Sequence, residues 1–204
     1  MTRAPRSLKS ALGIRLRGFG FRGSGAHFAR ATDKTINTVW LQSSKHGGST
    51  FVNLGLHFTF LPPNWCDALP PNRTWQEPDC EFRWRLLNEE TGQDCWGEGF
   101  DPEESVAQGE SIAQIYAQVG EGAFRRFATP EAVAQAVSLQ ALLAGEELSV
   151  PWRTTPVRMA LALSRIHKSL GNVKESASFA KWAISQLSGA SSLAQELTVL
   201  ANAA

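Results

Sequence analysis

Residues 51–60 of the sequence, Phe-Val-Asn-Leu-Gly-Leu-His-Phe-Thr-Phe, alternate between apolar and polar or small side chains. The even positions are all large and apolar: Val52, Leu54, Leu56, Phe58 and Phe60. A period of two puts successive side chains on opposite faces of a strand, so the segment predicts a strand with one buried apolar face. The opposite face carries Asn53 and His57. A chain with such a strand needs other elements to cover its apolar side.

The remaining strand signals predict a sheet around this segment. Further strands are expected at 26–32, 36–43, 81–87 and, more weakly, 95–100. Short links join the expected strands at 26–32, 36–43 and 51–60, and the link at 44–49 is rich in glycine. These short links favour an antiparallel meander. Residues 61–79 contain five prolines and are expected to form a long loop.

Helical patterns flank the expected sheet. Residues 6–17 predict an amphipathic helix, and the composition after residue 101 shifts towards alanine, glutamine, glutamate and leucine. The fold class is therefore α+β. We expect an antiparallel meander sheet of four to five strands with the N-terminal helix packed on one face, followed by an all-helical C-terminal part. The expected domains are 1–128 and 129–204.

Two similar signals mark helix starts in the C-terminal part. Thr129-Pro130-Glu131 combines an N-cap, a proline in the first turn and an acidic residue, and the helix is expected to run past Val137 to Leu142-Leu143. Thr155-Pro156 opens a second helix that ends at Leu170-Gly171. A third is expected at 174–187, and a short last one near Ser191.

Composition restricts the possible function. The net charge of +1 does not indicate a nucleic-acid binder, and the chain contains no apolar run long enough for a transmembrane helix. The basic N-terminus is not followed by an apolar segment, so no secretory signal is expected. The three cysteines are odd in number and widely spaced, which favours reduced thiols and a cytoplasmic location.

Motifs for cofactors, metals and catalysis are lacking. The cysteines and histidines lack the close spacing of zinc ligands, so no metal and no cofactor is expected. The run Gly18-Phe19-Gly20-Phe21-Arg22-Gly23 has the glycine spacing of a dinucleotide-binding loop. It precedes the first expected strand instead of following one, so this interpretation fails.

Residues 159–187 resemble a single tetratricopeptide-type helical hairpin. Leu170-Gly171 matches its leucine-glycine turn, Ser176 and Ala183 its small positions, and Ile184 the apolar position that follows. One repeat is too few for a solenoid, so the hairpin at about 156–187 is expected to cap neighbouring helices. A peptide-binding groove is the alternative.

The N-terminal part resembles a bacterial family known as domain of unknown function 4304. The resemblance rests on an ordered set of segments: Leu16-Arg17-Gly18-Phe19-Gly20-Phe21, Phe28-Ala29-Arg30, Val39-Trp40-Leu41-Gln42-Ser43-Ser44, Phe51-Val52-Asn53-Leu54-Gly55-Leu56, Cys80-Glu81-Phe82-Arg83-Trp84-Arg85-Leu86 and Cys95-Trp96. It covers about residues 8–130. The family has no assigned activity, so the resemblance implies a fold and no catalytic residues.

The alternation of the strands predicts one candidate site. Asn53 and His57 share the polar face of their strand, as Trp40 and Gln42, and Arg83 and Arg85, share a face of theirs. If these faces coincide, the sheet presents a surface that suits an anionic group or an acidic partner. An ordinary solvated sheet face is the alternative.

Three functions remain open on these grounds. The leading hypothesis is a non-enzymatic protein-interaction module of the bacterial cytosol, immunity- or antitoxin-like, that binds another protein through the polar sheet face or the helical hairpin. A small enzyme with a site around His57, Arg83 and Arg85 is the alternative. A nucleic-acid binder that uses the basic N-terminal helix is the third, and the oligomeric state is not predictable.

Overall fold

The computed structural model describes residues 5–64, 68–70, 72–187 and 192–203. Contacts divide the chain into two compact units, Met1–Arg126 and Phe127–Ala204. The first unit contains a six-stranded sheet and the second contains only helices, which confirms the predicted α+β class.

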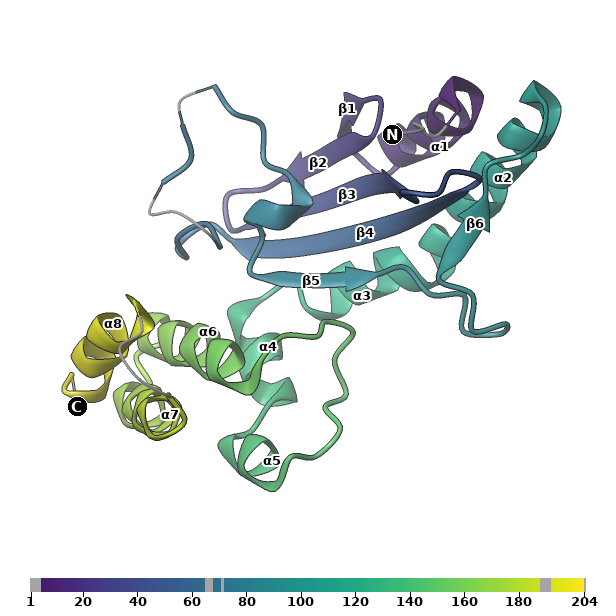
Figure 1. Cartoon of the computed structure of the whole chain (residues 1–204). Helices are drawn as coiled ribbons and strands as arrows, with labels where there is room; N and C mark the ends of the chain where they lie inside the picture. Colours follow the sequence, from purple (N-terminus) through teal and green to yellow (C-terminus); the bar gives the residue numbers. More distant parts are fainter. Residues whose placement is uncertain (1–4, 65–67, 71, 188–191, 204) are drawn as a thin grey trace. The chain divides into compact units, whose positions relative to one another are not determined.

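The sheet is antiparallel throughout (Figure 1). Its strands are β1 (Arg22–Ser24), β2 (His27–Ala31), β3 (Thr35–Ser43), β4 (Ser49–Phe58), β5 (Phe82–Arg85) and β6 (Cys95–Gly97). The first five lie in sequence order as a meander. Strand β6 departs from it, because it pairs with Ser49–Phe51 of β4 while β5 pairs with 53–56 of the same strand. Thus β5 and β6 follow one another along β4.

The long alternating strand ends earlier than its pattern predicts. Strand β4 stops at Phe58, where the Leu61 N–H donates to the Phe58 carbonyl and turns the chain. Phe60 is 45% exposed, so its prediction as a buried residue was wrong, although its ring stacks on Phe58 at 5.7 Å. Strand β1 was not predicted, because Gly23 (φ +136°) and Gly25 (φ +64°) read as a turn.

Helices cover the apolar face of the sheet. They are α1 (Arg6–Gly18), α2 (Pro102–Ile115), the π-helical turn η2 (Tyr116–Gly120) and α3 (Glu121–Arg126). A Cβ atom at Gly13 of α1 would lie 2.9 Å from the Phe28 ring, and one at Gly120 would lie 3.3 Å from Leu54. Burial of each large apolar side chain between these layers contributes about 1.5–3 kcal/mol.

The opposite face is covered at one end by the proline-rich segment. Residues 59–81 leave β4 and return to β5, and they include the short 3-10 helix η1 (Glu77–Asp79). Figure 1 shows η1 on the side of β3 and β4 away from α1 and α2. Within the described residues no helix has the length and apolar character needed to cross a membrane.

The second unit contains five helices among its described residues: α4 (Pro130–Ala136), α5 (Leu139–Ala144), α6 (Pro156–Ser169), α7 (Val173–Ser185) and α8 (Ser192–Ala201). The single helix predicted from 130 to 143 is two helices. Val137 takes an extended conformation (φ −133°, ψ 105°), and the Ser138 side chain accepts from the Ala141 N–H to cap α5. The chain therefore starts a second helix at Ser138 instead of continuing the first.

Helices α6 and α7 form a hairpin at the predicted position. Gly171 makes the turn with φ +77°. Ser164 and Ser176 exchange hydrogen bonds, since each hydroxyl donates to the other residue's carbonyl at 2.8 Å. These small side chains allow close approach of the two helices. The assignment of the α6–α7 hairpin to the tetratricopeptide type stays a prediction.

Candidate functional site

The six residues predicted for the site share one face of the sheet. Trp40 pairs with Asn53 across β3 and β4, and Asn53 pairs with Arg85 across β4 and β5. Gln42, His57 and Arg83 lie an even number of residues along the same strands and so point to the same side. This is the face opposite the helices α1 and α2.

The environment of His57 nevertheless differs from that of the other five residues. It is fully buried, and the Trp75 ring lies 4.5 Å from its own. The Glu81 N–H donates to Nδ1 at 3.2 Å, so the proton is on Nε2, which donates to the Leu61 carbonyl at 3.0 Å. Both ring nitrogens are engaged with the backbone of the 59–81 segment and its end. The His57 side chain is therefore covered and is not part of an accessible surface.

The described residues of the 59–81 segment cover this half of the face, and they include the buried thiol of Cys80. The Cys80 Sγ lies 3.4 Å from the Thr38 hydroxyl, and a Cβ atom at Gly55 would come within 2.8 Å of Sγ. Burial raises the pKa of the Cys80 thiol to about 12. The thiol is therefore protonated and shielded, which removes it as a nucleophile.

Arg83 borders the covered half. It is exposed, whereas Glu77 is buried in η1. Burial raises the pKa of the Glu77 carboxyl, and the charge of Arg83 opposes that rise. Part of the charge of Arg83 is therefore balanced by a carboxyl group of the same chain.

The other half of the face is accessible except at Asn53, which is buried at its centre. We call this half the open patch: His27, Trp40, Gln42, Phe51, Asn53 and Arg85. Asn53 is 7% exposed and its Nδ2 donates to the Gln42 Oε1 at 3.0 Å. The rings of His27 and Trp40 stack with centroids 5.7 Å apart. These contacts hold the flat side chains against the sheet.

Arg85 occupies the border of the open patch near β6. Its guanidinium lies 4.1 Å from the centroid of the Phe51 ring and donates to the Asp94 carboxylate at 3.0 Å. The side chains of Arg85 and Asp94 are 46% and 44% exposed, so solvent weakens this ion pair. Arg85 is thus oriented by its neighbours and still accessible to a partner.

The open patch suits recognition through flat aromatic and amide surfaces. Trp40, Phe51 and His27 are half-buried and present ring surface. Desolvation lowers the pKa of His27, so its ring is neutral at pH 7. The one cationic group in the patch is Arg85, which makes the patch amphipathic and weakly positive.

Sequence reasoning missed two members of the open patch, Phe51 and His27. It also missed a buried cluster formed by Arg30, Tyr116 and Glu121. Phe51 was detectable, because it lies two residues before Asn53 on the same face. His27 was not, because its position follows from its register with Trp40. The buried cluster is on the helical face, where Arg30 lies two residues after the buried Phe28. A charged residue on the buried face of a strand needs a partner, and this is the signal that could have revealed the buried cluster.

The Arg30–Glu121 ion pair of the buried cluster links β2 to the helices. Arg30 donates to the Glu121 carboxylate at 3.1 Å and to the Phe19 carbonyl at 2.8 Å. The Tyr116 hydroxyl donates to the same carboxylate at 2.7 Å, and burial with this contact raises the pKa of Tyr116. Arg30 also lies 4.7 Å from the Phe21 ring centroid. Its partners are all internal, so it acts in the structure of the unit.

Potential metal ligands are dispersed in the structure. Among the residues that the structure describes, no three His, Cys, Asp or Glu side chains are grouped so as to hold a metal ion.

Comparisons with known proteins place the chain in a family without an assigned activity. No curated protein and no solved structure matches the chain. A family model described as "Domain of unknown function (DUF4304)" matches residues 12–141, which include the whole sheet, the later part of α1, and α2, η2 and α3. The match extends over more than half of the sequence, and the chain therefore belongs to the DUF4304 family.

Proposed function

We propose that the chain is a non-enzymatic protein-interaction module that binds another protein through the open patch. The observation that carries this proposal is the gathering of Trp40, Phe51 and Arg85 around the Asn53–Gln42 amide pair on a sheet face away from the helices. Tryptophan and arginine are enriched among the residues that contribute most to protein interfaces.

The partner is expected to carry acidic and apolar groups. Arg85 offers a guanidinium plane beside Phe51, and the exposed Arg83 lies two residues away on the same face. A carboxylate of the partner could replace Asp94 at Arg85, while apolar groups pack on the Trp40 and Phe51 rings. Preorganisation of these side chains lowers the entropy cost of binding.

The enzymatic alternative depends on His57 as its acid–base group. His57 is fully buried, and its two ring nitrogens contact backbone groups of Leu61 and Glu81. A general acid or base has to reach a proton of the substrate. The observed environment therefore favours the interaction hypothesis.

The proposal places this module in the cytosol of a bacterium, with an immunity- or antitoxin-like role. The thiols of Cys80 and Cys95 are free, as suits a reducing compartment. The α6–α7 hairpin, which we interpret as tetratricopeptide-like, is the second surface that could contact a partner. The open patch is favoured over it because the patch combines aromatic rings with a guanidinium.

Site-specific photo-crosslinking tests the proposal. The photoreactive phenylalanine analogue p-benzoylphenylalanine would replace Phe51 in one variant and Phe100 in another. Phe100 is a matched control, since its side chain is fully exposed and lies outside the patch. In lysate of the source cells, we expect a specific crosslinked protein from position 51 and not from position 100.

Substitutions establish whether the capture depends on the patch. Trp40→Ala and Arg85→Ala should each reduce the crosslinked product at least tenfold, as expected for truncation of interface residues worth over about 1.4 kcal/mol. Arg17→Ala, which removes an exposed arginine of α1, should leave it unchanged. Equal crosslinking from positions 51 and 100, or capture insensitive to Trp40→Ala and Arg85→Ala, would contradict the proposal.

A further inference from the structure

One histidine side chain holds both ends of the segment that covers half of the sheet face. We call the described residues of this 59–81 segment the strap. The His57 Nε2 donates to the Leu61 carbonyl at 3.0 Å, near the start of the strap, and its Nδ1 accepts from the Glu81 N–H at 3.2 Å, at the end of the strap. Both contacts are with backbone groups, so they depend on which ring nitrogen carries the proton. The strap is therefore attached to β4 through the neutral form of one imidazole.

The surroundings of this imidazole are closed to solvent. His57 is fully buried, and the centroid of the Trp75 ring lies 4.5 Å from that of its own ring. The two ends of the strap also contact each other, since the Asn64 N–H donates to the Asp79 carbonyl at 2.9 Å. The adjacent Cys80 is fully buried as well. A charge on His57 would therefore be placed where water does not reach it.

Three carboxyl groups lie on the elements that pack around His57. The described ionisable residues of the strap and of the start of β5 are Arg73, Glu77, Asp79, Cys80, Glu81 and Arg83. On the β3 side, His57 is paired with the apolar Ile36. The Asp79 carboxylate already accepts from Arg73 and from the Gln76 N–H. Another carboxylate reaches Nδ1 only after the Glu81 N–H has moved away, so attraction to these groups does not preserve the closed strap.

We propose that His57 is a pH-sensitive switch whose protonation releases the strap from the sheet. A neutral imidazole has one acceptor nitrogen, whereas an imidazolium is a donor at both nitrogens. A proton added at Nδ1 would point at the Glu81 N–H, so this hydrogen bond is lost and two donors meet. The buried charge adds a cost of its own. Both effects are relieved when the strap leaves and the ring reaches water.

Acidification is the direction that favours release. The closed strap needs a neutral His57, whereas an exposed histidine binds a proton with an ordinary pKa of about 6.5. Below that pH the released state binds one proton more than the closed state, so the free energy that keeps the strap closed falls with falling pH. From about pH 7.5 to about pH 5.5, the released population should rise about tenfold.

Release would enlarge the accessible part of the sheet face. Thr38 and Gly55 are buried and pair with each other next to the strap. They lie two residues from Trp40 and Asn53 on the same face, so the surface exposed by release would be continuous with the open patch. The switch itself stands on the contacts of His57 and does not depend on the protein-binding proposal.

The Cys80 thiol reports release of the strap. The full-length protein would be treated with a dipyridyl disulfide, which reacts with accessible thiols in acid as well as at neutral pH, and labelled peptides would be quantified by mass spectrometry. The labelling rate at Cys80 divided by the rate at the half-buried Cys95 cancels the pH dependence of the reagent. We expect this ratio to rise about tenfold from about pH 7.5 to about pH 5.5. A ratio that does not change would overturn the proposal.

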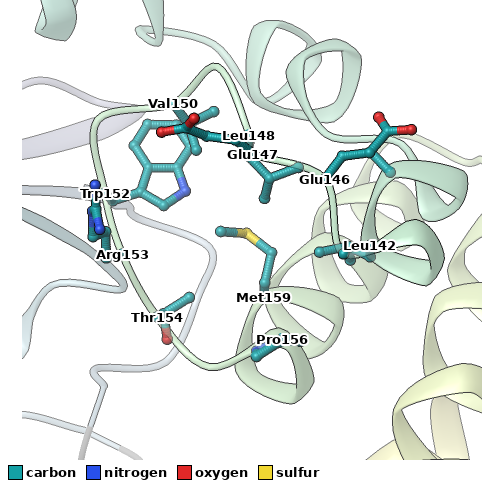
Figure 2. Close-up of a pocket in the computed structure, with 12 residues that line it drawn as sticks. Leu142, Glu146, Glu147, Leu148, Val150, Trp152, Arg153, Thr154, Pro156 and Met159 are labelled. Atoms are coloured by element: carbon teal, nitrogen blue, oxygen red, sulfur yellow. The ribbon is translucent and has the colours of Figure 1, made fainter.

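Tyr116 and Met159 show whether acid unfolds the chain as a whole. Tyr116 is the single tyrosine and is buried in the first unit. Met159 belongs to the second unit, where Figure 2 shows its side chain lining a cavity of about 360 Å³ that has no histidine among its described lining residues. In protein with isotope-labelled tyrosine and methionine, both NMR signals should keep their folded positions at the lower pH. Unfolded positions of these signals would assign the Cys80 labelling to general unfolding and would also overturn the proposal.

Three substitutions identify the titrating group. His57→Gln keeps an N–H donor for the Leu61 carbonyl and cannot be protonated, so its labelling ratio should be the same at both pH values, whether the strap is closed or released in it. His46→Gln, at an exposed histidine of the β3–β4 turn, should keep the rise. Glu77→Gln should keep it too, although burial raises the pKa of Glu77. A rise that persists in His57→Gln, or that is lost in His46→Gln or Glu77→Gln, would overturn the assignment to His57.

Discussion

Removal of one partner from the Arg30–Glu121 ion pair should destabilise the first unit strongly. The side chains of Arg30 and Glu121 are 21% and 8% exposed, so neither charge is fully solvated when its partner is lost. Breaking a buried pair costs about 3–5 kcal/mol. Glu121→Gln should cost less, about 2–3 kcal/mol, because Arg30 keeps the Phe19 carbonyl and some solvent.

A double-mutant cycle isolates the pairwise energy. Arg30→Met alone leaves the Glu121 carboxylate with the Tyr116 hydroxyl and with Arg125, whose Nε lies 3.5 Å away. The Arg30→Met, Glu121→Gln double variant leaves no unpaired charge of this pair. The double variant should lose about 1–3 kcal/mol less free energy of unfolding than the sum of the losses in the two single variants.

Equilibrium urea unfolding at pH 7 measures these free energies by linear extrapolation. The exposed pair of Arg15 and Glu110 provides the matched cycle. Its N–O distance is shorter, 2.7 Å, but its side chains are 60% and 36% exposed. Its coupling energy should be only about 0–1 kcal/mol. The reasoning is refuted if the Arg30–Glu121 coupling is no larger than that of the exposed pair.

Three other predictions follow from buried groups. Tyr116 is the single tyrosine, and its pKa is raised in the fold, so the folded state binds more protons above the ordinary tyrosine value near pH 10. The free energy of unfolding should therefore fall as pH rises through that range, and tyrosinate absorbance at 295 nm should appear only with unfolding. Gly55→Ala should cost about 1–3 kcal/mol in thermal unfolding, because its Cβ atom would lie 2.8 Å from the Cys80 sulfur, whereas Gly97→Ala has open space and should cost little. The Cys80 thiol, with its pKa of about 12, should resist iodoacetamide in the native protein while Cys95 is alkylated, as peptide mass spectrometry would report. Alkylation of both at equal rates would show that the 59–81 segment opens readily.

Features that depend on local periodicity were predictable from the sequence. The alternation around Val52–Phe58 gave the buried side of β4, because side-chain direction along a strand is set by the backbone itself. The same rule placed Trp40, Gln42, Arg83 and Arg85 on the faces where they occur. The start of α6 at Pro156 followed from its cap, which is also a local signal.

Features set by contacts between distant segments were not predictable. His57 obeys the alternation and points to the polar side, but residues 59–81 fold back over it, and their course depends on tertiary contacts. Pairing of β6 with β4 requires the register of two strands that are far apart in the sequence. The break at Val137 reflects competition between continuing a helix and forming the Ser138 cap, and composition does not decide that competition.

The arrangement of β5 and β6 along β4 has a kinetic consequence. Strands β3 and β4 are joined by five residues, Ser44–Gly48, whereas residues 59–81 separate β4 from β5. Closure of the longer loop costs about 1.4 kcal/mol more chain entropy, since the cost grows with the logarithm of loop length. The β3–β4 hairpin is therefore expected to form before β5 pairs with β4, and to serve as the template for both β5 and β6. Substitutions within it, such as Val39→Ala, should slow folding, whereas substitutions in β5, such as Phe82→Leu, should mainly accelerate unfolding in stopped-flow measurements.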